Sequence, residues 1–262
     1  MQLYKIVRYV IRDLLRSRWT YVYFAFYYLL GMVLLFINRD LSKAIITLMN
    51  IITILTPLIG TVFGVMYYYN SREFIQLLLA QPLRRNALFS GQYIGVSLSL
   101  SLSLILGLGI PFSMYGVLYS GVIWDFAVLL VIGGFLTFIF VGLALVVALA
   151  NDNRIKGFGY AIFLWLAFAV VYDGLFLLGL LYFRDYPLEK FALGGVLVNP
   201  IDLSRILILL KLDIAALMGF TGAVFKKVFG TSMGMLMAFG ALLLWVWIPW
   251  QLMLWFARRK DF

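Results

Sequence analysis

The chain has 262 residues, of which 65% are hydrophobic and 12% are charged, and its formal net charge is +10. Soluble domains are about 45–50% apolar and about 25% charged, so this composition excludes a water-soluble fold and indicates a protein that crosses a membrane several times. The chain contains neither Cys nor His, which excludes disulfides and thiolate or imidazole metal sites and favours transport or scaffolding over catalysis.

The first predicted element is a helix over residues 3–16 that is too polar to cross a membrane. Its apolar residues recur at helical spacing along one face, and its cations line the opposite face: Leu3, Ile6, Val7, Val10 and Leu14 against Lys5, Arg8, Arg12 and Arg16. A helix of this kind lies in the headgroup layer of a membrane. A simple topology anchor is the alternative interpretation.

Six later segments reach the length of about 20 mostly apolar residues that a membrane span needs. They predict an all-α membrane protein with one transmembrane domain, 1–262, and six spans: 19–37, 43–69, 92–119, 124–150, 157–182 and 231–256. No cleavage site of the signal-peptide type follows the first segment, so we expect it to be retained as a span.

The Lys and Arg residues predict how the spans are oriented. Of the 21 cations, 13 lie before the first span, in the second-to-third and fourth-to-fifth connections, and in the tail. The short connections on the other side hold only Arg39 and Lys43. Because cationic short loops stay in the cytoplasm, we expect both termini there, in a bacterial inner membrane.

Two patterns inside the predicted spans bear on packing. Pro57 and Pro111 fall in the second and third spans, where proline kinks a helix. A ridge of small residues follows the third span at four-residue intervals: Gly95, Ser99, Ser103 and Gly107. Such a ridge lets another helix approach closely. The ridge could serve packing within the chain, or it could form a pore or dimer face.

Two further features could carry chemistry. Asp173 is the one acid well inside a predicted span, and no basic partner is visible in the spans. An intramembrane acid is either a functional group or a structural hydrogen-bond partner, and the sequence leaves both open. Met233 and Met237 share one helical face; thioethers suit Cu(I), but Met also fills apolar helices. We predict no metal site and no cofactor for this chain.

The connection after the second span is more apolar than a bend requires. In "SREFIQLLLAQPLRR", the side chains of Phe74, Leu77 and Leu78 share one face of a predicted short helix that ends before Pro82. With six spans, cytoplasmic termini and the N-terminal helix, this segment resembles ABC-2 type permeases, in which the first cytoplasmic loop carries a coupling helix. That helix sits in a groove of the ATPase subunit.

The resemblance carries over to particular residues. The family pattern of an acid, three Leu, a Pro, an Arg and a Gly is matched by Glu73, Leu77–Leu79, Pro82, Leu83, Arg85 and Gly91. Phe74 and Ile75 stand where the family usually has small residues, and the Glu is shifted by a residue or two. The resemblance implies ATPase-coupling roles for these residues: Glu73, Phe74, Leu77, Leu78, Pro82 and Arg85. No phosphate-binding loop is present, so we expect a partner subunit to bind ATP and this chain not to be an enzyme.

The long outer segment 183–230 is rich in Leu, Ile, Val and Phe. Leu203, Ile206, Leu207 and Leu210 have helical spacing, Asp202 is placed to cap or to pair with Arg205, and a second short helix is predicted over about 212–229. The segment is either a lid over the protein's own spans or a platform for a periplasmic partner.

A narrower resemblance rests on Asn199, Pro200, Asp202 and Arg205, together with Asp173. These residues are similar to those of the ABC-2 permeases that serve maturation of the copper centres of nitrous oxide reductase. This resemblance implies a permease homodimer, two ATPase subunits and a periplasmic β-helical protein that docks at the same four outer residues. It leaves the cargo open between a sulfur species, copper and no cargo at all.

Other functions fit the sequence less well. Within the same class, the alternative is an exporter of lipid, polysaccharide or drug, or a permease of the gliding-motility type. An intramembrane enzyme would need the His, Cys or paired acids that the chain lacks. A purely structural membrane anchor would show no stimulation of an ATPase.

Overall fold

The structure is a computed structural model and describes residues 2–38, 40–80, 84–183, 189–212 and 232–260. Within these ranges it is helical and contains no strand. The helices are α1 (Gln2–Arg16), α2 (Arg18–Ile37), α3 (Leu41–Asn70), α4 (Arg72–Leu79), α5 (Arg85–Met114), α6 (Ile123–Ala150), α7 (Arg154–Leu166), α8 (Tyr172–Tyr182), α9 (Glu189–Val198), α10 (Pro200–Lys211) and α12 (Ser232–Arg259). A 3₁₀ turn, η1 (Val117–Tyr119), and a π-helical segment, η2 (Ala167–Val171), complete the set.

Six of these helical stretches are long and apolar enough to cross a membrane, which confirms the predicted fold class. The fifth span is composite, because α7, η2 and α8 together cover Arg154–Tyr182. The third span begins at Arg85, seven residues before the predicted start. Its first two turns mix Arg85, Asn86 and Ser90 with apolar residues, so hydropathy does not distinguish them from a loop.

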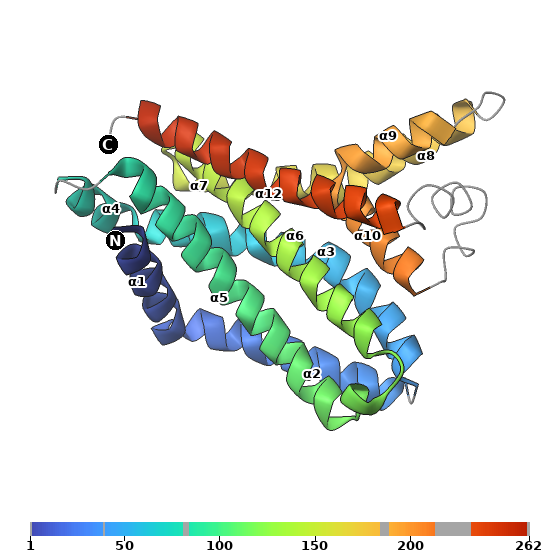
Figure 1. The fold of residues 1–262 in the computed structure, drawn as a ribbon. Helices are drawn as coiled ribbons and strands as arrows, with labels where there is room; N and C mark the ends of the chain where they lie inside the picture. Colours follow the sequence, from blue (N-terminus) through green and yellow to red (C-terminus); the bar gives the residue numbers. More distant parts are fainter. Residues whose placement is uncertain (1, 39, 81–83, 184–188, 213–231, 261–262) are drawn as a thin grey trace.

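The core of the bundle is formed around α6, which packs against α3 and against α5 (Figure 1). Helix α6 is the most hydrophobic span, and 61% of its apolar window is buried. Helix α2 packs on α5, and α12 packs on the far side of α6. The fifth span is peripheral, since only 11% of its window is buried within the chain.

The small-residue ridge of α5 is confirmed as a packing surface within the chain. A Cβ added at Gly107 would lie 2.8 Å from the Tyr27 Cβ and 3.0 Å from the Phe24 carbonyl of α2. Ser99 and Ser103, between the glycines, are buried. Helix α2 therefore approaches α5 at a distance that a larger side chain would not allow.

The N-terminal helix α1 docks on the start of α5 through the same device. A Cβ at Gly91 would lie 2.5 Å from Ile6 Cγ2, and one at Gly95 would lie 2.6 Å from Val10 Cγ1. Val10 is buried, as the predicted apolar face requires. Helix α1 is thus a fixed part of the bundle.

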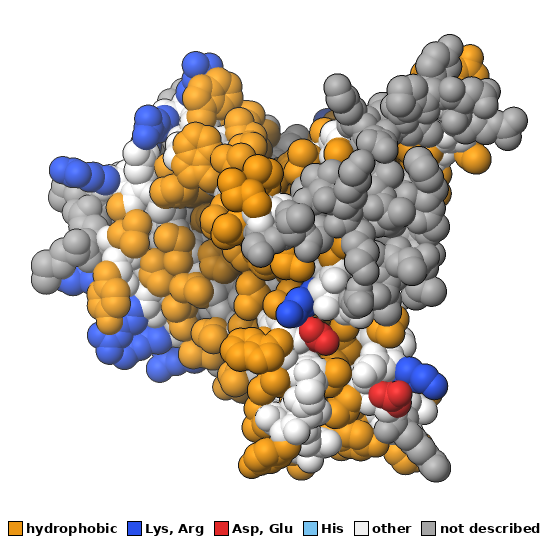
Figure 2. Space-filling view, turned by 45° about the vertical axis from the view of Figure 1, so that its right-hand side comes forward, with side chains coloured by type: hydrophobic (Ala, Val, Ile, Leu, Met, Phe, Trp, Pro, Cys, Tyr) orange, Lys and Arg blue, Asp and Glu red, His pale blue; other side chains and the backbone are white. Residues whose placement is uncertain are grey.

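Both termini, the short helix α4 and the start of α5 gather at one end of the bundle (Figure 1). Lys and Arg side chains also gather at this end, while hydrophobic side chains cover most of the remaining visible surface (Figure 2). We call it the basic end. It combines the N-terminal segment, the tail and the two connections from which the cytoplasmic side was predicted.

Helices α9 and α10 form a sharply bent pair, with an angle of 115° between them and the bend at Asn199. Hydrogen bonds place this bend at the middle of the fifth and last spans. The Asn199 amide donates to the Phe168 carbonyl, and the Trp245 indole donates to the Leu197 carbonyl, at 2.9 and 3.0 Å. Phe168 also contacts Phe140, in the second half of α6.

The short helix expected after Asn199 and Pro200 is therefore present as α10, and α9 precedes it, but the bend between them enters the bundle. A lid lying across the ends of the spans does not describe this placement. The physical reason is that α10 buries most of its residues against α3, α6 and α12, on both of its faces. The predicted helix over about 212–229 lies outside the described residues, apart from Leu212.

Candidate functional site

The predicted coupling helix exists as α4, eight residues long, at the basic end. Ile75 is its one fully buried side chain, whereas Leu77 is 69% exposed and Glu73 is exposed. Leu77 and Glu73 lie on the opposite side of the helix from Ile75 at 100° per residue. An apolar side chain that points away from the bundle, outside the membrane spans, is the feature expected of a contact with another protein.

An adjacent part of the α4 surface contacts the N-terminal helix. The ring of Phe74 stacks on Tyr9 of α1, with 5.0 Å between the ring centroids. Leu78 is half-buried, and Pro82 lies outside the described residues. The predicted face of Phe74, Leu77 and Leu78 is thus divided, since Phe74 faces α1 and Leu77 remains free.

The start of α4 is held by an ion-pair cluster that we call the clasp: Arg72, Asp152 and Lys260. Arg72 Nη2 lies 2.9 Å from Asp152 Oδ1, and its Nη1 donates to the Asp152 carbonyl at 3.0 Å. Lys260 Nζ lies 2.8 Å from the same Oδ1 and also donates to the Leu149 carbonyl. The clasp joins α4, the α6–α7 connection and the end of α12.

Electrostatics within the clasp favour the ionised carboxylate. The hydrogen bond from Lys260 and its charge, followed by the charge of Arg72, hold the pKa of Asp152 below its ordinary value. The Asp152 side chain is 72% exposed, whereas that of Lys260 is only 13% exposed. Solvent therefore weakens both ion pairs of Asp152. The clasp positions the three segments more than it stabilises the fold.

Two neighbouring contacts strengthen the same junction. The Tyr69 hydroxyl, at the end of α3, donates to the Asn151 carbonyl at 2.8 Å. Its ring lies so close to Gly157 that a Cβ there would overlap it. Arg85 Nη1 donates to the Lys260 carbonyl at 3.0 Å, so the predicted coupling residue Arg85 contacts the chain's own tail.

No sequence pattern indicates the clasp as a unit. Its three residues lie in separate connections, and charged residues in a loop are usually only solvated. The one available signal is Asp152, a single acid in a connection that otherwise carries cations.

A second cluster of polar side chains surrounds the α9–α10 bend. Asp173 is not isolated, as the sequence suggested, because Arg205 Nη1 lies 3.0 Å from its Oδ2. The same nitrogen lies 3.4 Å from Asp202 Oδ1. The expected pairing of Asp202 with Arg205 is therefore present, and one guanidinium nitrogen is shared by two carboxylates.

Asn199 caps α10 and ties the group to the fifth span. Its Oδ1 accepts from the Ile201 amide at 3.0 Å, and its Nδ2 donates both to Asp202 Oδ2 and to the Phe168 carbonyl. The π-helical segment η2 contains Phe168, and its wider turn changes the backbone pairing there. A buried Asn with its donor and acceptor both in use fixes the angle between the two helices.

These contacts bear on the predicted docking residues. Asn199, Pro200 and Asp202 are buried within the chain, and only Arg205, at 26% side-chain exposure, is accessible from outside. A docked partner would reach the group through Arg205 or by way of the helices around it. Met233 and Met237 are both exposed on α12, at 63% and 57%.

Comparison with known proteins shows which kind of protein the chain resembles. It is similar over its whole length to the probable ABC transporter permease protein NosY of Stutzerimonas stutzeri, with 26% identity over 287 aligned positions that cover 99% of each protein. The chain resembles an ABC transporter permease. No protein-family profile matches the chain.

The permease role explains the layout of the polar groups. A permease subunit is a multi-pass membrane protein that works with an ATPase subunit, and it needs a surface outside the spans that can receive the ATPase. Helix α4 supplies an exposed apolar side chain at the basic end, and the clasp connects it to helices on the far side of the bundle.

Proposed function

We propose that the chain is the permease subunit of a NosDFY-type ABC transporter. In this proposal it couples ATP hydrolysis by a partner ATPase to periplasmic maturation of the copper centres of nitrous oxide reductase. The basic end faces the cytoplasm of a bacterial inner membrane, with both termini there. The observation that carries the proposal is the free apolar side of α4, joined with the full-length similarity to a NosY protein.

Helix α4 is the proposed contact with the ATPase. Leu77 is the centre of its free side, with Glu73 one turn before it, and Ile75 anchors the helix from behind. A push on α4 is passed on at two points: through Phe74 to Tyr9 of α1, and through Arg72 to the clasp. The ATPase thus acts on the elements at the basic end together.

A second copy of the permease is the proposed cover of the fifth span. Little of this span is buried within one chain, and its Asp173–Arg205 pair keeps 30% and 26% side-chain exposure. A charged pair in contact with lipid is unfavourable, so protein or water should surround it. A homodimer that joins at this span would meet that requirement.

The α9–α10 pair is the proposed output on the periplasmic side. Its bend is bonded to the middle of the fifth and last spans, so that movement of either span displaces it. A periplasmic β-helical protein would receive this displacement. The displacement would either move a sulfur compound or copper across the membrane or act on the periplasmic protein without any cargo.

The test of the coupling contact is Leu77→Asp. We expect this variant to reach the membrane and fold, because Leu77 makes no buried contact, but to lose ATPase binding and reductase maturation. Leu77→Met is the matched control and should keep both. Copurification of the ATPase with Leu77→Asp at the wild-type ratio would exclude α4 as the contact.

The maturation role is tested separately in a strain that lacks this chain. Nitrous oxide reductase purified from that strain should lack part of its copper and sulfide, and the wild-type chain should restore both. A reductase with a full metal and sulfide content would exclude maturation and leave an ABC-2 exporter as the function.

A further inference from the structure

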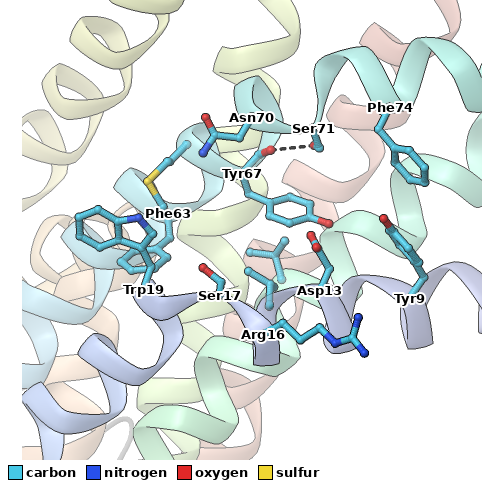
Figure 3. A pocket seen from close by; sticks show the side chains of 13 residues that line it. Tyr9, Asp13, Arg16, Ser17, Trp19, Phe63, Tyr67, Asn70, Ser71 and Phe74 are labelled. Atoms are coloured by element: carbon cyan, nitrogen blue, oxygen red, sulfur yellow. Dashed lines mark hydrogen bonds between the residues drawn. The ribbon is translucent and has the colours of Figure 1, made fainter.

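A hollow of about 420 Å³ lies beside the N-terminal helix at the basic end, between α1, the start of α2, the end of α3 and α4 (Figure 3). Its lining is divided by chemistry. Trp19, Phe63 and Met66 supply an apolar wall, while Asp13 and Arg16 supply charges. Nothing in the proposed coupling role requires such a hollow.

Asp13 is the unusual member of this lining. It is an acid on a helix whose other charged residues are cations, and Figure 3 shows its carboxylate turned toward the Tyr67 hydroxyl. It makes no salt bridge with a described residue. A carboxylate that faces a hollow without a cationic partner favours a ligand that carries a positive charge and N–H donors.

Arg16 lies one turn further along α1 and lines the same hollow. Residues three apart on a helix have Cβ atoms about 5–6 Å apart. The hollow therefore offers one negative and one positive group on neighbouring turns of one helix, and a phosphoethanolamine likewise carries an ammonium and a phosphate, joined by two carbons.

The surroundings favour a membrane phospholipid over a soluble compound. Asp13, Arg16 and Trp19 are exposed, so the hollow is open at the surface of an amphipathic helix. Helices with this pattern lie at the boundary of headgroups and acyl chains, and Trp is enriched at that level. The apolar wall then continues from the charged groups in the direction that an acyl chain would take.

We propose that this hollow binds a phospholipid with a primary-amine headgroup, with the ammonium at Asp13, the phosphate at Arg16 and an acyl chain along Trp19, Phe63 and Met66. Its outer wall is formed with Phe74 of α4. The bound lipid thus contacts the predicted coupling helix at Phe74, beside its free face. The binding itself does not depend on the proposed function.

The experiment uses the full chain, purified and delipidated in detergent. Binding is measured by native mass spectrometry during titration with phosphatidylethanolamine, phosphatidylglycerol, phosphatidylcholine or free phosphoethanolamine. We expect phosphatidylethanolamine to bind at least tenfold more tightly than the other two lipids, because only it offers N–H donors on a cation. Free phosphoethanolamine should bind weakly, since it lacks an acyl chain.

Variants locate the site. Asp13→Asn should lose the tenfold preference, and Arg16→Gln should weaken phosphatidylethanolamine binding. Arg12→Gln, an exposed change on the same helix outside the hollow, should bind like the wild type. Tyr67→Phe tests whether Asp13 acts only as a structural partner, because it removes the hydroxyl and keeps the carboxylate. It should retain the preference.

Three results would overturn the proposal. They are an unchanged preference in Asp13→Asn, equal binding of phosphatidylglycerol to the wild type, and binding of free phosphoethanolamine as tight as that of the lipid. A photoactivatable phosphatidylethanolamine with a diazirine on its acyl chain should label peptides that contain Trp19, Phe63 or Met66. Labelling confined to other peptides would likewise refute this site.

Discussion

The Nζ atom of Lys260 lies 2.8 Å from Oδ1 of Asp152, and the Arg72 guanidinium contacts the same oxygen at 2.9 Å. One carboxylate therefore holds the last helix and the predicted coupling helix at a single point. The contact requires three connections that are far apart in the sequence to meet at the basic end.

We expect Asp152→Asn to reduce reductase maturation several-fold while the amount of assembled complex changes little. The amide keeps the shape but removes the charge that both cations share, and exposed ion pairs contribute only about 1 kcal/mol or less to stability. The measurement is ATP turnover per matured reductase. Asp125→Asn, at the start of α6 and so at the far end of the helix that leads to Asp152, is the matched control. Equal turnover in both variants would show that the clasp plays no part in coupling.

The clasp should also have a defined pH dependence. Because Lys260 lowers the pKa of Asp152 below its ordinary value of 3.8, the contribution of the clasp to stability is fully present above that value. It is lost as pH falls through the lower pKa of the folded state. The difference in unfolding midpoint between the wild type and Asp152→Asn should be constant from about pH 8 to 5 and shrink below about pH 4. A difference that shrinks between pH 8 and 5 would contradict this assignment.

Arg205→Gln should destabilise the permease by about 2 kcal/mol. Removing one partner of a buried pair costs about 3–5 kcal/mol, and the partial exposure of Arg205 and Asp173 lowers that figure. Lys211→Gln, an exposed change on the same helix, should cost less than about 0.5 kcal/mol. Combining Arg205→Gln with Asp173→Asn should recover part of the loss in a double-mutant cycle. Additive effects would mean that the pair contributes no coupling energy.

Asn199→Ala should cost more than Asn153→Ala, although both residues cap a helix. Asn153 is exposed and accepts only from the backbone amides of α7, so its loss should cost about 1 kcal/mol. Asn199 also donates to Phe168 and Asp202, and leaving those buried acceptors without a donor should raise the cost to about 3 kcal/mol. Unfolding of the two purified variants in denaturing detergent compares them. Equal costs would mean that the bend is held by packing alone.

The spans were predictable from sequence because each depends on local hydropathy over about 20 residues. The same holds for α1, whose two faces are separated by charge. The α9–α10 bend was not predictable, because neither helix is long enough to be recognised as a span. The depth of the bend within the bundle depends on hydrogen bonds to Phe168 and Trp245, which lie in other helices. No local pattern encodes those contacts.

The candidate sites likewise depend on contacts that the sequence does not reveal, and two residues illustrate this. Asp173 looked isolated because Arg205, its partner, lies in a different element of the outer segment, where charges are expected to be solvated. In α4, five of the eight residues are apolar and they fall on more than one side of the helix, so the sequence could not identify Ile75 as the buried side chain. Only the packing of α4 on its neighbours decides which side remains free.

The docking of α1 against Gly91 and Gly95 has a consequence for how the protein is made. Those glycines lie in the third span, which leaves the ribosome after α1 and after two complete spans. During synthesis α1 therefore waits at the membrane surface without its final binding partner. Its cationic face and its exposed apolar residues suit that interval, since together they hold the helix at the lipid boundary until α5 is inserted. A larger residue at Gly91 or Gly95 would leave α1 permanently in the waiting position.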